Sequence, residues 1–416
     1  MNTYAVLKAT EAKAGARSIA TVTTLQKSKA LTLMAKYIKD EAAFIISENS
    51  LDIDQAITKG LSPAMIDRLR ITEKTINEMA NGLIEVSQMK DPVGEIVSMW
   101  SRPNGMRVGR MRSPIGSILI IYESRPNVTA DATALCLMAG NSVILRGGSE
   151  AINSNKAIVT LLKRAVNEVG INDGAVTFID NTDRVIIKEL LQLTNLIDLC
   201  IPRGGEGLIR SVTENSLIPV LKHYKGVCHV YVDRDSDLDM ALKVAFNSKV
   251  QRPGTCNAME TLLVDKPAAK VFLQQMIKNL EVAGVKLLGC IDTVMMFPQI
   301  DPAEKSDFYN EYLELKMNIK IVDGIDEAIA HINTYSSAHT DTIVTNSHER
   351  AMRFISEVDS AAVMVNASTR LHDGGQFGLG AEIGISTDKL HARGTMGINE
   401  LTCVKYIVLG NGQIRE

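Results

Sequence analysis

The 416-residue chain has few aromatic side chains and little excess charge of either sign. Phe, Trp and Tyr make up 4% of the residues, and 45 Lys and Arg against 48 Asp and Glu give a formal net charge of −3. Nucleic-acid-binding proteins combine a basic surface with aromatic side chains that stack on bases. The composition therefore argues against partners such as nucleic acid or a membrane surface, and leaves room only for a local basic site.

The chain also lacks any regular spacing of its six cysteines. No two of them form a C-x-x-C pair, and none has a metal-ligand spacing with the seven histidines. We therefore expect reduced thiols and no metal, as in a cytoplasmic protein. The start, Met1-Asn2-Thr3-Tyr4, lacks the apolar segment of a signal peptide, and no stretch reaches the length of a membrane span.

Short apolar runs alternate with amphipathic stretches along most of the chain. Up to about residue 90 the pattern is helical, with Leu31, Met34, Ala35 and Ile38 on one face. Apolar runs at 117–122, 142–145, 176–179 and 197–201 are then separated by helical stretches, and the alternation starts again near 230–233. This pattern predicts parallel, doubly wound α/β sheets, with a ligand at the carboxyl ends of the strands of the first sheet.

Two further segments, 105–111 and 403–409, are alternating or apolar and flank the compact units. Strands of this kind often pair with a neighbouring subunit, although they are also found as edge strands of their own domain. We expect two α/β domains at 1–228 and 229–396, with a flap formed by 98–113 and 397–416. A homo-oligomer is the expected assembly.

One cysteine lies in a sequence that favours an exposed nucleophile. Cys256 follows the turn Pro253-Gly254, between a helical stretch and an apolar strand-like run. A thiolate at the mouth of a cleft can attack an acyl carbon. The alternative is an ordinary buried cysteine. No G-x-G-x-x-G follows a strand, so the common dinucleotide fingerprint cannot be claimed.

Six stretches, in order, resemble the aldehyde dehydrogenase superfamily, and most closely its gamma-glutamyl phosphate reductases. They are Ser113-Pro114-Ile115-Gly116, Tyr122-Glu123-Ser124-Arg125-Pro126-Asn127-Val128-Thr129, Leu145-Arg146-Gly147-Gly148-Ser149-Glu150, Ile201-Pro202-Arg203-Gly204-Gly205-Glu206-Gly207, Gln251-Arg252-Pro253-Gly254-Thr255-Cys256-Asn257 and Phe377-Gly378-Leu379-Gly380-Ala381-Glu382-Ile383-Gly384. The resemblance spans nearly the whole chain. It implies an aldehyde-dehydrogenase-like fold with a cofactor-binding domain, a catalytic domain carrying Cys256 and an oligomerisation flap.

The resemblance implies NADPH-dependent reduction of L-glutamyl 5-phosphate to L-glutamate 5-semialdehyde and phosphate, in proline biosynthesis. Cys256 would attack the acyl phosphate, and the resulting thioester would be reduced. Aldehyde-oxidising relatives carry a water-activating glutamate in a Leu-Glu-Leu-Gly-Gly stretch. The corresponding segment 221–226 has no carboxylate, which favours a reductase over a hydrolytic dehydrogenase. We interpret His223, in this segment, as structural.

The resemblance also assigns roles to single residues. The backbone N–H of Cys256 is one oxyanion donor, and Ser124 or Asn127 stands where relatives carry a second. Arg146 and Ser149, where relatives place a lysine and an acid, suit NADP(H) better than NAD. Gly204 and Gly205 would let the backbone approach the cofactor, with a plain turn as the alternative. A surface salt bridge is the alternative for Arg146. Glu311 resembles the glutamate that holds the nicotinamide ribose.

The substrate would carry a carboxylate, an ammonium and a phosphate, so its site should offer cations and polar donors. The candidates are Arg125, Asn366, Ser368 and Arg370. Arg252 is a candidate for lowering the pKa of Cys256, or else points to solvent. Association with glutamate 5-kinase, which would supply the unstable acyl phosphate, is a hypothesis from the chemistry alone.

Three other functions remain open at this point. An acylating aldehyde dehydrogenase that uses coenzyme A would share the fold and the thiolate. A cysteine hydrolase would need a histidine beside Cys256 as base, and no histidine motif in the sequence supports it. A non-catalytic binding protein would not need the Cys256 turn.

Overall fold

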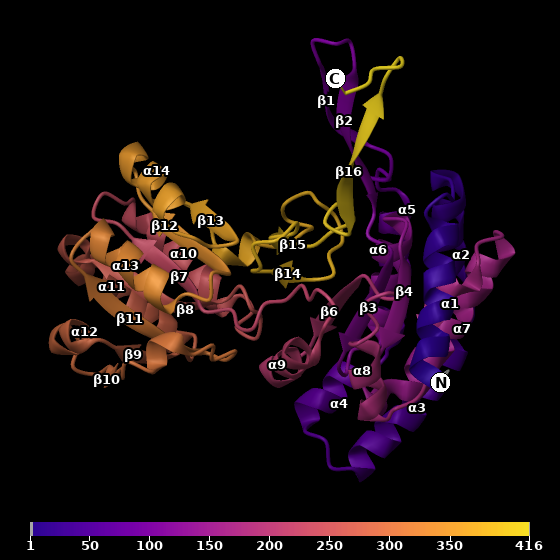
Figure 1. The fold of residues 1–416 in the computed structure, drawn as a ribbon. Helices are drawn as coiled ribbons and strands as arrows, with labels where there is room; N and C mark the ends of the chain where they lie inside the picture. The colour runs from indigo at the N-terminus through magenta and orange to yellow at the C-terminus, as the bar shows by residue number, and fades with distance from the viewer. Residues whose placement is uncertain (1–2, 416) are drawn as a thin grey trace.

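The computed structural model describes residues 3–415 as two α/β units and a projecting flap (Figure 1). Five helices open the chain and belong to the first unit: α1 (Tyr4–Ile19), α2 (Thr24–Asp40), α3 (Ala42–Thr58), α4 (Pro63–Leu69) and α5 (Glu73–Ser87). Thr3, Thr23 and Thr72 cap α1, α2 and α5 by accepting a backbone N–H. The predicted apolar face of α2, which includes Leu31 and Ile38, is buried.

A four-stranded parallel sheet forms the centre of the first unit. Its strands are β3 (Ser117–Tyr122), β4 (Ser142–Arg146), β5 (Val176–Phe178) and β6 (Leu199–Arg203), in the order β5-β4-β3-β6. They alternate with α6 (Asn127–Met138), η1 (Ser149–Ala151), α7 (Ile152–Glu168), η2 (Asp173–Ala175), α8 (Arg184–Leu190) and α9 (Glu206–Asn215). All six residues of β3 and all five of β4 are buried, as expected of strands covered on both faces.

The second unit contains a seven-stranded sheet in the order β10-β9-β11-β8-β7-β12-β13, in which every pair is parallel. The strands are β7 (Cys228–Val232), β8 (Met259–Asp265), β9 (Lys286–Gly289), β10 (Asp301–Pro302), β11 (Lys316–Val322), β12 (Thr340–Val344) and β13 (Ala362–Val365). The helices are α10 (Leu238–Val250), α11 (Lys266–Val282), α12 (Ile291–Met296), η3 (Asp307–Tyr309), α13 (Ile325–Tyr335) and α14 (His348–Glu357). The fold class predicted from the alternating pattern is confirmed.

After η4 (Thr369–Leu371) the chain returns to the first unit. This return segment, residues 372–401, contains the short antiparallel pair β14 (Ile385–Ser386) and β15 (Gly394–Thr395). Ile383, Met396 and Leu401 lie in the same hydrophobic core as β3 and β4. The domain boundary expected at residue 396 stays a proposal, and this shared core favours counting 383–401 with the first unit.

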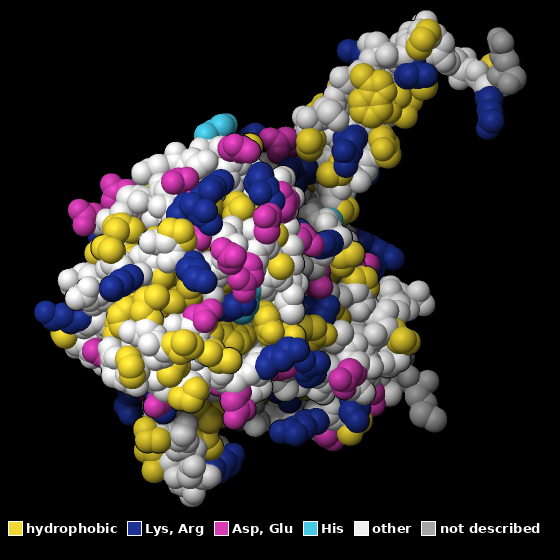
Figure 2. Space-filling model, turned by 90° about the vertical axis from the view of Figure 1, so that its left-hand side faces the viewer, with side chains coloured by type: hydrophobic (Ala, Val, Ile, Leu, Met, Phe, Trp, Pro, Cys, Tyr) yellow, Lys and Arg dark blue, Asp and Glu magenta, His cyan; other side chains and the backbone are white. Residues whose placement is uncertain are grey.

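The flap is a three-stranded antiparallel sheet that projects from the first unit (Figure 1). The central strand β2 (Arg107–Pro114) pairs with β1 (Ile96–Ser101) on one side and with β16 (Thr402–Leu409) on the other. The two predicted flap segments are thus neighbours. Hydrophobic side chains gather along the projecting arm in Figure 2, and Trp100 and Tyr406 pack edge to face across it. Among residues 3–415, no helix has the length and apolar character needed to cross a membrane.

Candidate active site

Cys256 is half-buried in the loop between α10 and β8. The turn is fixed locally, since Thr255 Oγ1 donates to the Arg252 carbonyl at 2.8 Å and Ala258 N–H to the Thr255 carbonyl at 3.0 Å. The loop lies at the amino ends of β7 and β8, where Cys228 pairs with Met259. The carboxyl ends of β3 and β6 in the first unit contribute Arg125 and Arg203 to the same site.

Arginines surround the thiol. Burial raises the pKa of Cys256 to about 11, and the nearby charge of Arg203 opposes that rise. Burial together with Arg203 and Arg252 lowers the pKa of Arg125, while burial and Arg252 lower that of Arg370. The thiolate of Cys256 acts in the opposite direction on Arg125 and Arg370. A dense positive cluster of this kind suits a substrate with phosphate and carboxylate groups.

Arg203 has a role that the sequence did not reveal, although it lies in one of the six resembling stretches. Its guanidinium lies against the backbone of Gly384, where an added Cβ would be 2.1 Å from Nη1. Gly384 also has a φ of +137°, which side chains rarely adopt. Any larger residue at this position would force the arginine to move. The return segment therefore lies against the cation that faces Cys256.

Two histidines accompany the thiol. Cys256 Sγ, one ring nitrogen of His223 and one of His339 lie within 4.8 Å of one another. The two rings pack edge to face with centroids 5.3 Å apart. The sequence gives no sign that segment 221–226 passes the nucleophile, and the structural interpretation of His223 stays a prediction. Zn²⁺ also accepts thiolate and imidazole ligands, so assays should contain a chelator.

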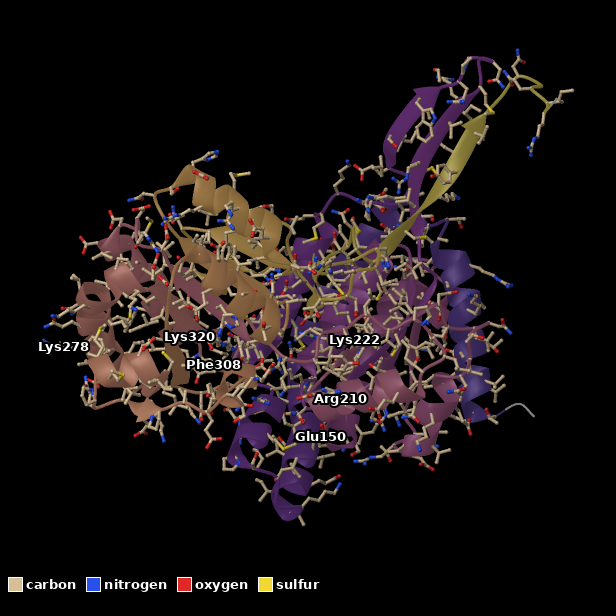
Figure 3. The ribbon with its side chains drawn as sticks, turned by 60° about the vertical axis from the view of Figure 1, so that its left-hand side comes forward. Glu150, Arg210, Lys222, Lys278, Phe308 and Lys320 are labelled. Carbon is tan, nitrogen blue, oxygen red and sulfur yellow. The ribbon has the colours of Figure 1, made fainter. Side chains whose placement is uncertain are left out.

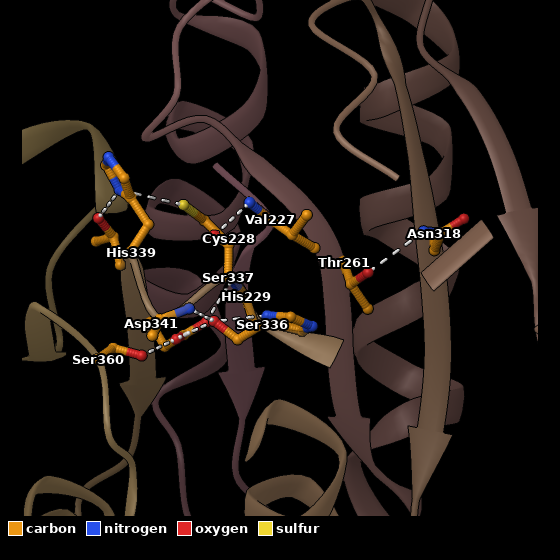
Figure 4. Close-up of polar contacts among 12 residues, drawn as sticks. Val227, Cys228, His229, Thr261, Asn318, Ser336, Ser337, His339, Asp341 and Ser360 are labelled. Atoms are coloured by element: carbon orange, nitrogen blue, oxygen red, sulfur yellow. Dashed lines mark hydrogen bonds and ion pairs between the residues drawn. The ribbon is translucent and has the colours of Figure 1, made fainter. Parts of the chain in front are cut away.

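A chain of buried polar contacts begins at the backbone of Cys256, and Figure 4 shows its link between Cys228 and His339. The Cys228 thiol donates to the Cys256 carbonyl at 3.2 Å and lies 3.8 Å from His339 Nδ1. Thr340 Oγ1 lies 2.7 Å from His339 Nδ1 and 2.7 Å from His372 Nδ1. Burial lowers the pKa of His372 to about 4 and holds that of His339 well below its ordinary value. Both rings are therefore neutral at pH 7, and these hydrogen-bonded side chains form an uncharged layer next to the nucleophile loop.

Both side chains expected to donate to the oxyanion, Ser124 and Asn127, already make hydrogen bonds within the protein. Ser124 Oγ and N–H donate to Glu150 Oε1, at 2.6 and 2.8 Å; Glu150 is labelled on the first unit in Figure 3. Asn127 Nδ2 donates to Asp131 at 3.1 Å, one turn along α6. Ser124 Oγ thus gives its single hydrogen to Glu150, whereas the Asn127 amide has a second N–H. Asn127 and the backbone N–H of Cys256 therefore remain the candidate donors.

The four substrate-binding candidates divide into two pairs. Asn366 donates to the Thr345 carbonyl and accepts from its N–H, and Ser368 bonds to Ser248 at 3.0 Å. These two side chains hold loops together. Arg125 and Arg370 belong to the positive cluster, and Arg370 reaches the nucleophile loop through Gln251 and Asn257.

Comparison with known proteins agrees with this site. Residues 3–316 match the sequence profile of the aldehyde dehydrogenase family. The chain is 61% identical over 409 residues to the gamma-glutamyl phosphate reductase of Thermodesulfovibrio yellowstonii, covering 98% of each chain. It is 54% identical over 404 residues to that of Desulfatibacillum aliphaticivorans, covering 97% of each. The chain belongs to the aldehyde dehydrogenase family, within its gamma-glutamyl phosphate reductases.

A solved structure of the family has the same architecture. The crystal structure of gamma-glutamyl phosphate reductase from Thermotoga maritima matches with a TM-score of 0.98 at 45% identity, and the match covers 100% of both chains. An acetylating aldehyde dehydrogenase from Geobacillus thermoglucosidasius matches with a TM-score of 0.67 at 16% identity. The second match shows the shared fold of the wider family and nothing about its chemistry in this chain.

Membership of the aldehyde dehydrogenase family implies a nicotinamide cofactor. Two groups of candidates for binding it lie at the carboxyl ends of β4 and β6, on either side of β3. Arg146 ends β4 and donates to the carbonyls of Gly147 and Thr182, at 2.7 and 3.0 Å, while its buried Nε has no partner among the described residues. Gly205 precedes α9, its N–H donates to Glu123 Oε2 at 3.0 Å, and a Cβ added to it would meet no atom within 4 Å. A buried guanidinium nitrogen without a partner fits a phosphate-bearing ligand.

The other two cofactor candidates lie apart. Ser149 is exposed at the start of η1. Glu311 accepts the N–H of Gly226 at 2.9 Å, and burial raises the pKa of its carboxyl. Its negative charge also acts on Cys256. Glu311 therefore lies near Cys256, and its role in binding the nicotinamide ribose stays a prediction.

A substitution at Gly226 tests how strongly the reaction rate depends on the position of the Cys256 loop. A Cβ at Gly226 would lie 1.8 Å from the Cys256 carbonyl oxygen, so Gly226→Ala must push the loop aside. We expect kcat to fall by about 100-fold, since a 1 Å misplacement of reacting groups can cost that much. The measurement is steady-state kinetics beside a thermal unfolding curve.

The matched control is Gly82→Ala in α5. Its added Cβ would meet only Asp131 Oδ1 at 3.6 Å, an ordinary contact, so wild-type kinetics are expected. Unchanged turnover in Gly226→Ala would mean that the loop is not held where the structure has it.

Proposed function

We propose that this chain reduces L-glutamyl 5-phosphate to L-glutamate 5-semialdehyde and phosphate with NADPH, the second step of proline biosynthesis from glutamate, through a thioester on Cys256. The observation that carries this proposal is one half-buried thiol inside a cluster of arginines contributed by both units. Its close relatives bear the name of this activity.

The positively charged and hydrogen-bonding groups of the site would have separate roles in the reaction. Arg125 and Arg370 would bind the anionic groups of the substrate, since a guanidinium matches phosphate and carboxylate geometry. Arg203 would stabilise the negative charge of the Cys256 thiolate before it attacks. The backbone N–H of Cys256 would donate to the oxyanion, where one such donor is worth about 3 kcal/mol in barrier height. When bound, the nicotinamide cofactor supplies the hydride.

Phosphate dependence is the direct test. Purified chain, glutamate semialdehyde, phosphate and NADP are combined, and NADPH absorbance is followed. The proposal requires that NADP reduction stop when phosphate is left out. Turnover without phosphate would indicate a hydrolytic dehydrogenase, and turnover supported by coenzyme A in its place would indicate an acylating one.

One structural observation keeps a cysteine hydrolase as a second candidate. Such an enzyme needs a histidine beside its nucleophile, and His223 and His339 lie near Cys256. A hydrolase would cleave a glutamyl thioester with no nicotinamide cofactor present. The proposed reductase would not turn over under those conditions.

Ser149 allows a test of the preference for NADP(H). We expect Ser149→Glu to lower kcat/KM for NADP roughly tenfold or more relative to NAD, because like charges about 4 Å apart near a surface repel by about 1–4 kcal/mol. The exposed position should tolerate the change. Ser149→Gln, with the same size and no charge, is the control and should keep the preference. An equal effect of both variants would place the 2′-phosphate elsewhere.

We also propose that the flap mediates homo-oligomerisation. Its two edge strands expose Ile96, Val97, Trp100, Tyr406 and Val408, and exposed apolar edges are templates for pairing. A monomer mass by light scattering would contradict this. Association with glutamate 5-kinase remains a hypothesis, which absence of comigration between the two purified proteins would count against.

A further inference from the structure

We propose that His223 is the base that takes the proton of the Cys256 thiol and returns it to the departing phosphate. This inference rests on the proposed function and adds a catalytic residue to it. His223 lies in the segment between α9 and β7, and one of its ring nitrogens is within 4.8 Å of Cys256 Sγ. A base in a site without substrate is often further from its proton than in the reacting complex.

The ring of His223 is held in one tautomer by the return segment. Its Nδ1 lies 2.7 Å from the carbonyl oxygen of Ile385 in β14. A carbonyl oxygen only accepts hydrogen bonds, so Nδ1 carries the hydrogen and the lone pair of the neutral ring is on Nε2. Among residues 3–415, the hydrogen bond of this ring is made through Nδ1 and none involves Nε2. The unprotonated nitrogen is therefore free to accept a proton.

The charge state of the ring suits a base. Burial and the positive charge of Arg203 lower the pKa of His223, and Asp388 acts weakly in the opposite direction. Asp388 is itself paired with Lys222 at 3.1 Å. His223 is therefore unprotonated at pH 7, and the carboxylate of Asp388 is close enough to favour the imidazolium once a proton arrives.

The thiol needs such a partner. A thiol with a pKa of about 11 is ionised to only about one part in 10,000 at pH 7. Attack without a base would have to wait for that rare thiolate. Removal of the proton as sulfur approaches the acyl carbon avoids the wait.

His339 is the less suitable neighbour, although it belongs to the same cluster. Its ring is fully buried between His223 and His372. Its Nδ1 faces a threonine hydroxyl, which can donate or accept, so no single tautomer is imposed. Forming an imidazolium there would place an unpaired charge in the core, which costs several kcal/mol. We assign proton transfer to His223 and support of the loop to His339.

The proton balance of the step is complete. The S–H bond breaks as its proton moves to His223 Nε2, and the S–C bond forms at the acyl carbon. The bond from that carbon to the phosphate oxygen then breaks, and the imidazolium gives its proton to this oxygen. Hydrogen phosphate leaves, the thioester remains, and His223 is neutral again before the cofactor acts.

His223→Asn is the variant that separates chemistry from structure. Its amide can still donate to the Ile385 carbonyl, but it has no basic nitrogen. We expect kcat for phosphate-dependent NADP reduction, with a chelator present, to fall by about 100-fold to 10,000-fold, the usual contribution of a general base. The thermal midpoint should stay close to that of wild type.

The pH profile is the readout that a structural role would not move. In wild type, activity should fall as pH drops below the pKa of His223, which lies under 6.5. The titratable and charged groups near this ring are Arg203, Cys256, His339, His372 and Asp388, of which Asp388 is paired with Lys222. In His223→Asn the acidic limb should disappear, and activity should rise with pH as the thiolate fraction grows.

His223→Ala with added imidazole keeps the proposal testable if His223→Asn folds poorly. Imidazole should restore part of the activity in His223→Ala and none in Cys256→Ala. Wild-type kcat with an unchanged acidic limb in His223→Asn, or no rescue by imidazole, would overturn the proposal. Failure of the proposed function is distinguishable, since wild type itself would then show no phosphate-dependent NADP reduction.

Discussion

Cys256→Ala should lose phosphate-dependent NADP reduction by at least roughly 10,000-fold, because no other group can form the thioester and nucleophile removal has effects of this size or larger. The thiol lies among Arg125, Arg203 and Arg370, whereas Cys136, Cys200 and Cys228 are buried. Activity is measured as NADPH absorbance, and folding is checked by the thermal midpoint.

Cys290→Ala is the matched control for this experiment. Cys290 is also half-buried, but its sulfur lies 3.3 Å from Thr293 Oγ1 at the start of α12 in the second unit. Wild-type activity is expected in this variant. Turnover that survives in Cys256→Ala would mean that a different residue is the nucleophile, and the thioester route would have to be abandoned.

Lys249→Met should destabilise the chain by about 3–5 kcal/mol, because it leaves the charge of Glu260 buried without a partner. Lys249 Nζ and Glu260 Oε2 are 2.7 Å apart, and both side chains are fully buried. They lie on α10 and β8, the two elements that flank the nucleophile loop. Chemical denaturation gives the change in the free energy of unfolding.

Two comparisons make that result specific. Lys249→Met combined with Glu260→Leu removes both charges and should recover most of the loss, since replacing a whole buried pair is often neutral or better. Lys286→Met breaks the exposed pair with Asp301 and should cost less than about 1 kcal/mol. A loss in the double variant as large as in Lys249→Met would assign the effect to packing.

The deficit in Lys249→Met should also depend on pH. Burial raises the pKa of Glu260 from its ordinary 4.5 even beside Lys249, and removing the cation raises it further. A raised pKa means that the folded state binds the proton more tightly than the unfolded state, so stability falls as pH rises from about 4.5 toward the folded value. Denaturation at pH 5 should therefore show a smaller deficit than at pH 8.

Much of the fold could be predicted because the signal was local. The apolar runs at 117–122 and 142–145 are strands because helices cover both faces of the sheet. β1 escaped prediction as a strand since all six of its residues are exposed and no alternation marks it. The turn of Cys256 was evident from Pro253-Gly254 alone.

The rest of the site depends on contacts between distant segments. His223 reaches the thiol in the tautomer set by Ile385, 162 residues away, and Arg203 needs the space left by Gly384. Neither pairing leaves a mark on local sequence. For Ser124 the prediction was too simple. Its position in the sequence suggested a free donor, but the fold brings Glu150 close enough to accept a hydrogen bond from its hydroxyl.

The late position of the return segment and β16 has a consequence for how the chain is made. Cys403 lies opposite Ser113, 290 residues earlier, and Ile383, Met396 and Leu401 complete a core that begins in α1 and α2. Contacts so far apart in sequence form slowly, and domains fold as units during synthesis from the N-terminus onward. The first unit is translated first, but it cannot finish folding until the return segment and β16 have left the ribosome. Until then its hydrophobic core is incomplete and β2 has an unpaired edge. Both are surfaces that a chaperone can bind.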